Sequence, residues 1–379
     1  MNDRDSEALL GLFLERGYSI VEFPEEADVI LINTCSVREH AENRAISFLG
    51  SLKKLKNSKF EIRNSKLIIG LIGCMAKNRG QEIFKKMLHI DLICGPASFD
   101  KIPDYVERIK NERARIIDLV DKPRCEDFYH ASFRVEPDHA QVIISVGCSN
   151  YCSYCIVPYV RGPLRPRAPQ DIIDEIKKNV DLGIKKITLL GQNVNDYLYS
   201  YPGLKRPSAS VSFVELLRRV EAIEGVSEID FVTSHPKNTS PELFCLMRES
   251  KKIRKHLHLP FQSGSDRILK LMNRGYTKKD YLRLIKDYTD IVKGTLSTDV
   301  MVGFPTETVE DFLQTKDVLE KVKFRYAYIF KYSSRPRTEV AKLADDVPQK
   351  EKERRHKILL ELQKKISLEN KIESIGQKK

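Results

Sequence analysis

Long apolar runs are missing from this chain of 379 residues. No stretch approaches the roughly 20 apolar residues that a helix needs to cross a bilayer. The first residues include acidic side chains, Asp3, Asp5 and Glu7, where a secretory signal peptide needs basic ones. We therefore expect a cytoplasmic protein with no membrane span and no export signal.

Cysteines number only eight, and nothing in the sequence places them in an oxidising compartment. Without an export signal, they are better interpreted as metal ligands or free thiols than as a disulfide framework. The net charge of +12 favours contact with polyanions through phosphate groups. By itself this charge is a weak signal, because many basic proteins never bind nucleic acid.

Three of the cysteines, Cys148, Cys152 and Cys155, lie within eight residues and follow an apolar run over 142–146 that predicts a buried strand. Thiolates at such spacing can wrap one metal centre, and cuboidal iron–sulfur clusters use similar runs. A structural zinc site or an electron-transfer cluster needs four ligands, but no fourth cysteine or histidine lies close in sequence. Three thiolates would leave one iron open to a chelating small molecule. The alternatives are a zinc knuckle with a distant fourth ligand and three buried free thiols.

The pattern Cys-x3-Cys-x2-Cys after a strand, with Tyr154 before the last cysteine, resembles the signature of the radical S-adenosylmethionine (SAM) superfamily. Further segments resemble the methylthiotransferase family within it: Tyr-Val-Arg-Gly (159–162), Leu-Gly-Gln-Asn-Val (190–194), Thr-Ser-His-Pro (233–236), His-Leu-Pro-Phe-Gln-Ser-Gly-Ser (258–265), Met-Asn-Arg-Gly-Tyr (272–276) and Val-Gly-Phe-Pro (302–305). The resemblance covers nearly the whole chain. It implies that Cys148, Cys152 and Cys155 hold a 4Fe-4S cluster whose open iron binds SAM.

The resemblance also implies a function and partners. The expected reaction adds a methylthio group to C2 of N(6)-dimethylallyladenosine next to the anticodon of tRNA, with a reducing partner such as flavodoxin or ferredoxin. Related alternatives are the same chemistry on threonylcarbamoyladenosine or on a ribosomal protein; segments 191–193 and 233–236 favour the dimethylallyl substrate. Alternatives from other classes are a truncated, non-catalytic iron–sulfur protein that binds tRNA and a structural zinc protein with a basic surface.

In the first 120 residues, helix signals alternate with apolar strand signals at 29–32, 67–72 and 90–93, which predicts a parallel sheet covered on both faces. Ligands of such sheets gather outside the carboxyl ends of the strands. Cys35 and Cys74 follow the first two strands and so fall at that edge. The resemblance implies that both are ligands of a second, auxiliary 4Fe-4S cluster; the alternative is that they are small buried apolar residues.

The start of the chain departs from the family, because the first of its three auxiliary cysteines and the preceding strand are not found. We expect a flavodoxin-like sheet with its central first strand missing, so that the strands at 29–32 and 67–72 face each other across an unpaired gap. One hypothesis is that Met1 is an internal methionine of a longer protein. A rival is that Cys94, at the same edge, is the third ligand instead of a core residue. Cys125 and Cys245 have no partner at ligand spacing and are interpreted as inert.

From residue 141 onward, six strands are expected near 141–146, 186–191, 228–232, 256–259, 296–302 and 325–331. Six βα units suit a partial (β/α)6 barrel, in which chemistry is found at the C-terminal ends of the strands. The cysteine motif, Gln192, Asn193, His235 and Gln262 are all expected at that end. Gln192 and Asn193 match the polar motif with which the superfamily contacts SAM. Asp299 is expected either to face SAM or substrate or to be a buried polar residue bonded to the backbone, and hydrogen-bonding roles are expected for His235 and His258.

The expected domains are 1–120 with the auxiliary cluster, a linker over 121–135, the radical SAM barrel over 136–347 and a charged helix over 348–379. The helix is expected to pack across the barrel. The family continues into an RNA-binding β-barrel domain where this chain stops, which would weaken its grip on RNA. Two basic segments, one with Arg161, Arg165 and Arg167 and the other over 251–255, are interpreted either as phosphate contacts or as solvated surface.

Overall fold

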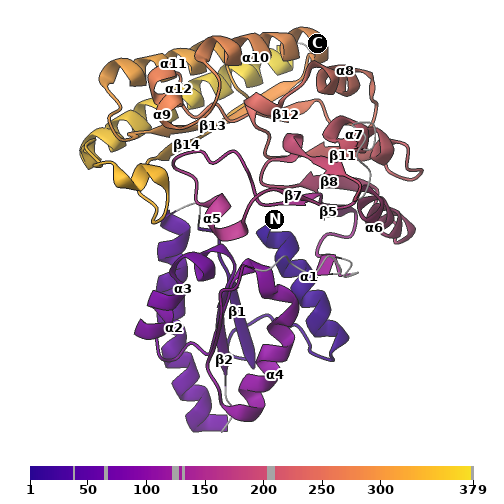
Figure 1. Ribbon diagram of the computed structural model, residues 1–379, viewed down its shortest axis with the longest axis vertical. Helices are drawn as coiled ribbons and strands as arrows, with labels where there is room; N and C mark the ends of the chain where they lie inside the picture. The colour runs from indigo at the N-terminus through magenta and orange to yellow at the C-terminus, as the bar shows by residue number, and fades with distance from the viewer. Residues whose placement is uncertain (37–38, 64–66, 122–127, 130–132, 203–209, 377–379) are drawn as a thin grey trace. The chain divides into compact units, whose positions relative to one another are not determined.

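The computed structural model describes residues 1–36, 39–63, 67–121, 128–129, 133–202 and 210–376 (Figure 1). It divides into two compact units. Unit 1 is Met1–Pro137 with Ile156–Pro163, and unit 2 is Asp138–Cys155 with Leu164–Lys379. The predicted α/β fold, an N-terminal parallel sheet followed by a partial barrel, is confirmed; the domain boundaries at 120, 135 and 347 stay predictions. No helix within the described ranges is long and apolar enough to cross a membrane.

Unit 1 is built on a sheet of four parallel strands in the order β1-β2-β3-β4. The strands are β1 (Val29–Asn33), β2 (Ile68–Ile72), β3 (Leu92–Cys94) and β4 (Ile116–Asp118). The helices are α1 (Asn2–Glu15), α2 (Glu39–Arg63), α3 (Cys74–Lys86), η1 (Pro96–Lys101), α4 (Ile102–Glu112) and α5 (Val157–Arg161). Every residue of β2 is buried, as expected of an inner parallel strand covered on both faces.

The expected gap between the strands at 29–32 and 67–72 was a wrong prediction. β1 pairs directly with β2, in register from Val29 with Ile68 to Asn33 with Ile72. Direct pairing satisfies the backbone groups that a gap would leave without partners, and this is the physical reason for the closed arrangement. β1 therefore lies at one side of the sheet, and all five of its residues are only half-buried.

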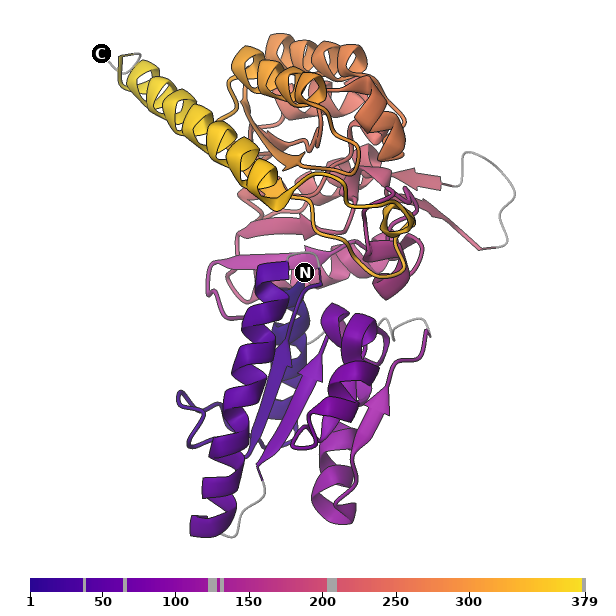
Figure 2. The ribbon, with the colours of Figure 1, turned by 90° about the vertical axis from the view of Figure 1, so that its left-hand side faces the viewer.

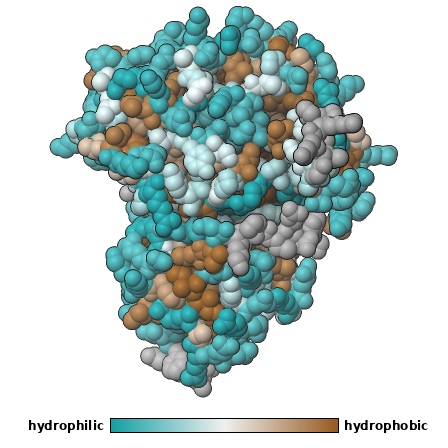
Figure 3. Space-filling model, in the orientation of Figure 1, coloured by the Kyte–Doolittle hydropathy of each residue, from teal (hydrophilic) through white to brown (hydrophobic). Residues whose placement is uncertain are grey.

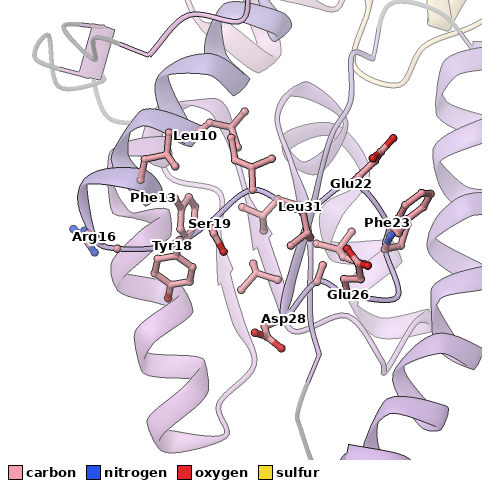
Figure 4. Close-up of a pocket in the computed structure, with 18 of the residues that line it drawn as sticks. Leu10, Phe13, Arg16, Tyr18, Ser19, Glu22, Phe23, Glu26, Asp28 and Leu31 are labelled. Carbon is pink, nitrogen blue, oxygen red and sulfur yellow. The ribbon is translucent and has the colours of Figure 1, made fainter.

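A pocket of about 640 Å³ lies beside β1 (Figure 4). Residues of α1 and of the segment that connects α1 to β1 form its other walls. Leu10, Phe13 and Tyr18 line it together with Leu31 of β1. The same unit exposes Ile20, Val21 and Phe23 among its large apolar side chains, and Figure 3 shows apolar surface on this unit. The residues lining the pocket include no cysteine and no histidine, so the predicted cluster ligands lie elsewhere.

Unit 2 contains the six predicted parallel strands. They are β5 (His139–Ile143), β8 (Lys186–Leu190), β11 (Glu228–Phe231), β12 (His256–His258), β13 (Thr295–Val302) and β14 (Tyr326–Lys331). They pair in two sheets, β11-β8-β5 and β12-β13-β14, and a bridge from Ile229 to Ile253 links β11 to the segment before β12. This is the strand order of an open, partial barrel. Two short antiparallel pairs that the sequence did not predict are β6 (Ser145–Val146) with β7 (Arg165–Pro166) and β9 (Leu198–Ser200) with β10 (Ser210–Ser212).

Helices cover the outside of the barrel strands: α6 (Pro169–Asp181), α7 (Phe213–Glu221), α8 (Pro241–Glu249), α9 (Asp266–Leu271), α10 (Lys278–Val292), α11 (Val309–Val322) and α12 (Gln349–Gly376). The long yellow helix in Figure 2 is α12, which packs on β14 and α11 and buries Leu359 and Ile366. Side chains alternate across each strand, so apolar residues such as Ile187, Ile229 and Val300 pack under the helices. Their neighbours on the other face are partly exposed and mostly polar: His139, Gln141, Thr188, Asp230, His256, His258 and Asp299. The inner face of the barrel is therefore a polar surface that can receive a ligand.

Asp311 of α11 links two of these helices, α11 and α9, to each other. Its carboxylate accepts hydrogen bonds from Ser265 Oγ at 2.5 Å and from the backbone nitrogen of Thr308 at 2.9 Å, and it pairs with Arg267. Thr308 caps α11 and Ser265 caps α9. Burial raises the pKa of Asp311, but the hydrogen bonds from Arg267, Ser265 and Thr308 outweigh it and lower this pKa to about 2.

We expect Asp311→Asn to destabilise the protein by about 2 kcal/mol at pH 7, because the carboxylate binds protons less readily in the folded state. This stability is present above the ordinary pKa of an aspartate and is lost as the pH falls towards 2, so the variant and the parent should differ by about half as much at pH 3. Urea denaturation at both pH values measures the difference. The exposed ion-paired Asp290 offers the control Asp290→Asn, which should change stability by less than about 0.5 kcal/mol. If the loss of stability in Asp311→Asn did not depend on pH, the lowered pKa of Asp311 would be contradicted.

Candidate functional site

The three clustered cysteines lie in the loop that follows β6, at the C-terminal end of the barrel strands. Cys152 is buried, whereas Cys148 and Cys155 are partly exposed. Burial raises the pKa of the Cys148 thiol. The loop begins at Gly147, whose φ of 84° favours glycine, and the Gly147 nitrogen donates to Gln192 Oε1 at 2.5 Å. The amide oxygen of Gln192, a predicted SAM contact, thus holds the cysteine loop in place.

Two groups that can donate a hydrogen bond, the Arg274 guanidinium and the His235 imidazole, lie next to the Cys152 sulfur. Arg274 Nη1 lies 3.5 Å from Cys152 Sγ, and His235 Nε2 lies 4.0 Å from it. His235 Nδ1 accepts from the nitrogen of Lys237 at 3.2 Å, so the proton of the neutral ring is on Nε2, facing the sulfur. Burial, reinforced by the charge of Arg274, lowers the pKa of His235 to about 2. His235 is therefore a neutral hydrogen-bond donor at physiological pH, which agrees with its predicted role.

The loop after β11 is fixed by a side chain to which the sequence gave no role. Asn195 Oδ1 accepts from the nitrogen of His235 at 2.9 Å, and Asn195 Nδ2 donates to the His235 carbonyl at 3.0 Å. Thr233 adopts a φ of 69°, which is unusual for a residue other than glycine, and donates to the Gly191 carbonyl at 2.6 Å. These bonds place His235 next to the segment that carries Gln192.

Unpartnered polar atoms gather near the same loops. Asn193 is almost fully buried; its Nδ2 donates to Asn238 Oδ1 at 3.2 Å. Asn193 Oδ1, Ser145 Oγ and Ser234 Oγ are buried without a hydrogen-bond partner among the described residues. Such atoms normally find partners, so their presence beside three thiols fits a site that receives a polar ligand and a metal cluster.

Asp299 faces the inside of the barrel from β13. Its Oδ2 lies 3.6 Å from His258 Nε2, and His258 Nδ1 lies 2.9 Å from Ser297 Oγ. The ring of Tyr328, on the outermost strand β14, packs edge-on against His258 at 6.1 Å between centroids. Asp299 is partly exposed and lies beside an imidazole, so of the two predictions the one in which it faces a ligand fits its surroundings better.

In unit 1, the structure brings Cys35 and Cys74 to one edge of the sheet. The segments that carry them are hydrogen-bonded, with the Met75 nitrogen donating to the Thr34 carbonyl at 3.1 Å. Gly73 makes this approach possible: its φ is 92°, and a Cβ there would collide with Asn33 Oδ1. Cys74 is also the first residue of α3.

The interpretation as phosphate contacts is wrong for two basic side chains, Arg161 and Arg167, because the structure buries both. Arg161 pairs with Asp5 at 2.8 Å and donates through Nε to Cys74 Sγ at 3.2 Å. Arg167 pairs with Glu175 at 2.7 Å. Charged groups this deeply buried need partners within the protein, which leaves them unable to reach RNA.

Lysines in the basic run over 251–255 mainly donate hydrogen bonds to carbonyls at the ends of helices. Lys252 Nζ donates to the Glu221 carbonyl at the end of α7, and Lys255 Nζ donates to the Arg248 carbonyl in the last turn of α8, at 2.7 and 2.8 Å. Arg254 pairs with Asp230 at 2.9 Å. These contacts satisfy carbonyls that have no partner within a helix.

The remaining cysteines have no shared site in the described residues. Cys94 is fully buried, and its Sγ lies 3.4 Å from the carbonyls of Gly95 and Ser98, which fits a core residue better than a cluster ligand. Cys245 lies on α8, and Cys125 falls outside the described residues. Within those ranges, no three His, Cys, Asp or Glu side chains are placed close enough to hold a single metal ion.

Comparison with known proteins identifies the class. Residues 142–319 match the model of the Radical SAM superfamily, and residues 1–95 match "Uncharacterized protein family UPF0004". Among solved structures, a radical S-adenosylmethionine methyltransferase from Kitasatospora setae aligns with a TM-score of 0.56 at 14% identity, over 89% of this chain and 67% of that one. The fold and the three-cysteine loop are thus those of a radical SAM protein.

The relatives identify the family. The tRNA-2-methylthio-N(6)-dimethylallyladenosine synthase of Acetivibrio thermocellus is 44% identical over 97% of this chain and 75% of its own length. The synthase of the same name from Caldicellulosiruptor saccharolyticus is 43% identical over 99% of this chain and 78% of its own. The chain belongs to the tRNA-2-methylthio-N(6)-dimethylallyladenosine synthase family.

Proposed function

We propose that this protein is a radical SAM methylthiotransferase that adds a methylthio group to C2 of N(6)-dimethylallyladenosine in the anticodon loop of tRNA. The observation that carries the proposal is the placement of the three-cysteine loop beside unpartnered polar atoms at the C-terminal end of the barrel. The family to which the chain belongs supplies the substrate. An adenosine in a single-stranded loop can turn its base out of the stack and into a protein site.

Within this proposal, Cys148, Cys152 and Cys155 would hold the 4Fe-4S cluster that binds SAM, and Cys35 and Cys74 would hold the auxiliary cluster. When bound, the clusters and SAM supply the radical and sulfur chemistry. The chain's own residues orient and shield these groups.

Each supporting residue has a defined task. Gln192 holds the cysteine loop through Gly147, and His235 directs an N–H at Cys152. Asn193 Oδ1 and Ser234 Oγ are available to bind the polar parts of SAM, and Asp299 with His258 faces the space in which the adenosine would lie. A cytoplasmic reducing partner such as flavodoxin or ferredoxin would deliver electrons.

An assay on defined RNA tests the function. The reconstituted chain is incubated without oxygen with SAM, dithionite and an anticodon stem-loop that carries N(6)-dimethylallyladenosine, threonylcarbamoyladenosine or plain adenosine. We expect mass spectrometry to detect a methylthio group only on the first substrate, and Cys152→Ala to abolish it while Cys245→Ala does not. Product on the threonylcarbamoyl substrate alone would support the related alternative, and bound iron without product on any RNA would support the non-catalytic one.

A further inference from the structure

Arg274 is a buried cation without a carboxylate. Only 4% of the residue is exposed. Its guanidinium donates to the Pro260 carbonyl at 2.7 Å and to Tyr276 Oη at 3.0 Å, and Nη1 lies 3.5 Å from both Tyr154 Oη and Cys152 Sγ. Among the residues that the structure describes, no Asp or Glu oxygen lies within 4.0 Å of it.

Three other buried arginines in the described part of the chain do not share this arrangement. Arg161 pairs with Asp5, Arg167 with Glu175 and Arg355 with Glu307, at 2.8, 2.7 and 2.5 Å. A buried charge without a counter-ion is strongly destabilising, and pairing is the usual remedy. The position of Arg274 therefore calls for an anion that is not a carboxylate.

The phenols around Arg274 cannot provide that anion. Phenols are weak acids that keep their proton at neutral pH, so Tyr154 and Tyr276 are not anions. The Pro260 carbonyl is neutral as well. Of the groups that the guanidinium contacts, only the sulfur of Cys152 can be an anion, as the thiolate that a metal centre requires.

The backbone around Arg274 is fixed to the cysteine loop. Asn273 has a φ of 56°, and its Nδ2 donates to the Tyr151 carbonyl at 3.0 Å. Ser153 donates through its nitrogen to the Met272 carbonyl at 3.0 Å and through Oγ to the Leu271 carbonyl at 2.7 Å. These bonds hold the end of α9 against the loop and so keep the backbone of Arg274 beside it. The hydrogen bonds to the Pro260 carbonyl and to Tyr276 Oη hold the guanidinium itself.

We propose that Arg274 is a positioning residue that acts as the fixed counter-cation of Cys152 and of the cluster which this thiolate ligates. The inference rests on the proposed function only for the identity of that cluster. One-electron reduction by an external donor adds one negative charge to the cluster and breaks no bond. A cation held near the cluster stabilises the reduced form more than the oxidised one, so Arg274 raises the reduction potential.

The test measures the midpoint potential of the cluster by anaerobic dithionite titration followed by electron paramagnetic resonance. The full chain carries Cys35→Ala and Cys74→Ala, so that only the cluster on the Cys148 loop contributes. We expect Arg274→Met and Arg274→Gln to decrease the equilibrium constant for reduction at least ten-fold, which is about 59 mV for one electron. Arg274→Lys, which keeps the charge, should stay within about three-fold of the parent, and the exposed Arg283→Met is the matched control.

Two results would overturn the proposal: full iron content with an unchanged potential in Arg274→Gln, or an equal decrease in Arg274→Lys and Arg274→Gln, which would indicate a role for shape and not for charge. If Arg274→Met fails to assemble the cluster, the midpoint potentials of Arg274→Lys and Arg274→Gln still test the proposal. These outcomes are separate from a failure of the proposed function, because the potential is measured without RNA. A parent chain without iron would overturn the cluster assignment itself.

Discussion

Replacing Cys148, Cys152 and Cys155 together by alanine should remove about four irons from each reconstituted chain, because one 4Fe-4S cluster loses all of its protein ligands. SAM cleavage should be lost completely. Anaerobic iron and sulfide quantification after reconstitution measures the first effect, and the release of 5′-deoxyadenosine measures the second. The control Cys245→Ala changes a cysteine on α8, outside the site, and should keep the parent's iron.

The iron content of the parent separates the remaining possibilities. About eight irons, with half surviving the triple substitution, would mean that Cys35 and Cys74 assemble a second cluster with another ligand. About four irons, all lost in the triple variant, would mean that only the SAM-binding cluster forms. A colourless preparation with one zinc would contradict the radical SAM assignment of these cysteines and support a structural zinc site.

Gly264→Ala should be among the most destabilising single substitutions in the barrel, by about 3 kcal/mol or more. A Cβ at this position would lie 2.7 Å from the carbonyl carbon of Gln314 and 2.8 Å from Thr315 Cα, and it would collide with the Gln314 carbonyl oxygen. These are backbone atoms of α11, so no side chain can turn aside to relieve the overlap. The Gly264 nitrogen also donates to Thr315 Oγ1 at 2.9 Å, and a shift of the helix would break this bond.

Urea denaturation of Gly264→Ala measures the loss, and Gly50→Ala provides a matched control. Gly50 lies within α2, and a Cβ there would meet no atom within 4 Å. Alanine is the better helix former, so this control should be neutral or stabilising by up to about 1 kcal/mol. Equal stability of both variants would show that α11 is free to move away from Gly264, contrary to the packing described above.

The parts of the site that follow from topology were predictable from the sequence. Apolar runs with helical segments between them indicate parallel strands, and such strands end at one edge of a sheet or barrel. Cys35 with Cys74 and, in the other unit, the Cys148 loop with Gln192 and His235 are indeed found at those edges. Asn195 and Arg274 lie in or next to the recognised segments, but their spacing gave no reason to assign a role.

Charge was the least predictable property. Arg161 and Lys252 look like solvated cations in the sequence, yet one is buried against Asp5 and Cys74 and the other completes the end of α7. Whether a basic side chain faces water or a buried partner depends on which distant segment packs against it. The pairing of β1 was also decided by the tertiary structure. β1 pairs directly with β2, because unsatisfied backbone groups between the two strands would be destabilising.

The sequence by itself determined the class of fold, the family and the cysteines expected to carry the chemistry, because these depend on local spacing and on the regular geometry of parallel strands. The tertiary structure decided what surrounds those cysteines. Arg274 is 122 residues from Cys152 in the chain but 3.5 Å from its sulfur. Such a contact arises from the packing of separate elements around a buried group, and the strength of a buried charge depends on that packing.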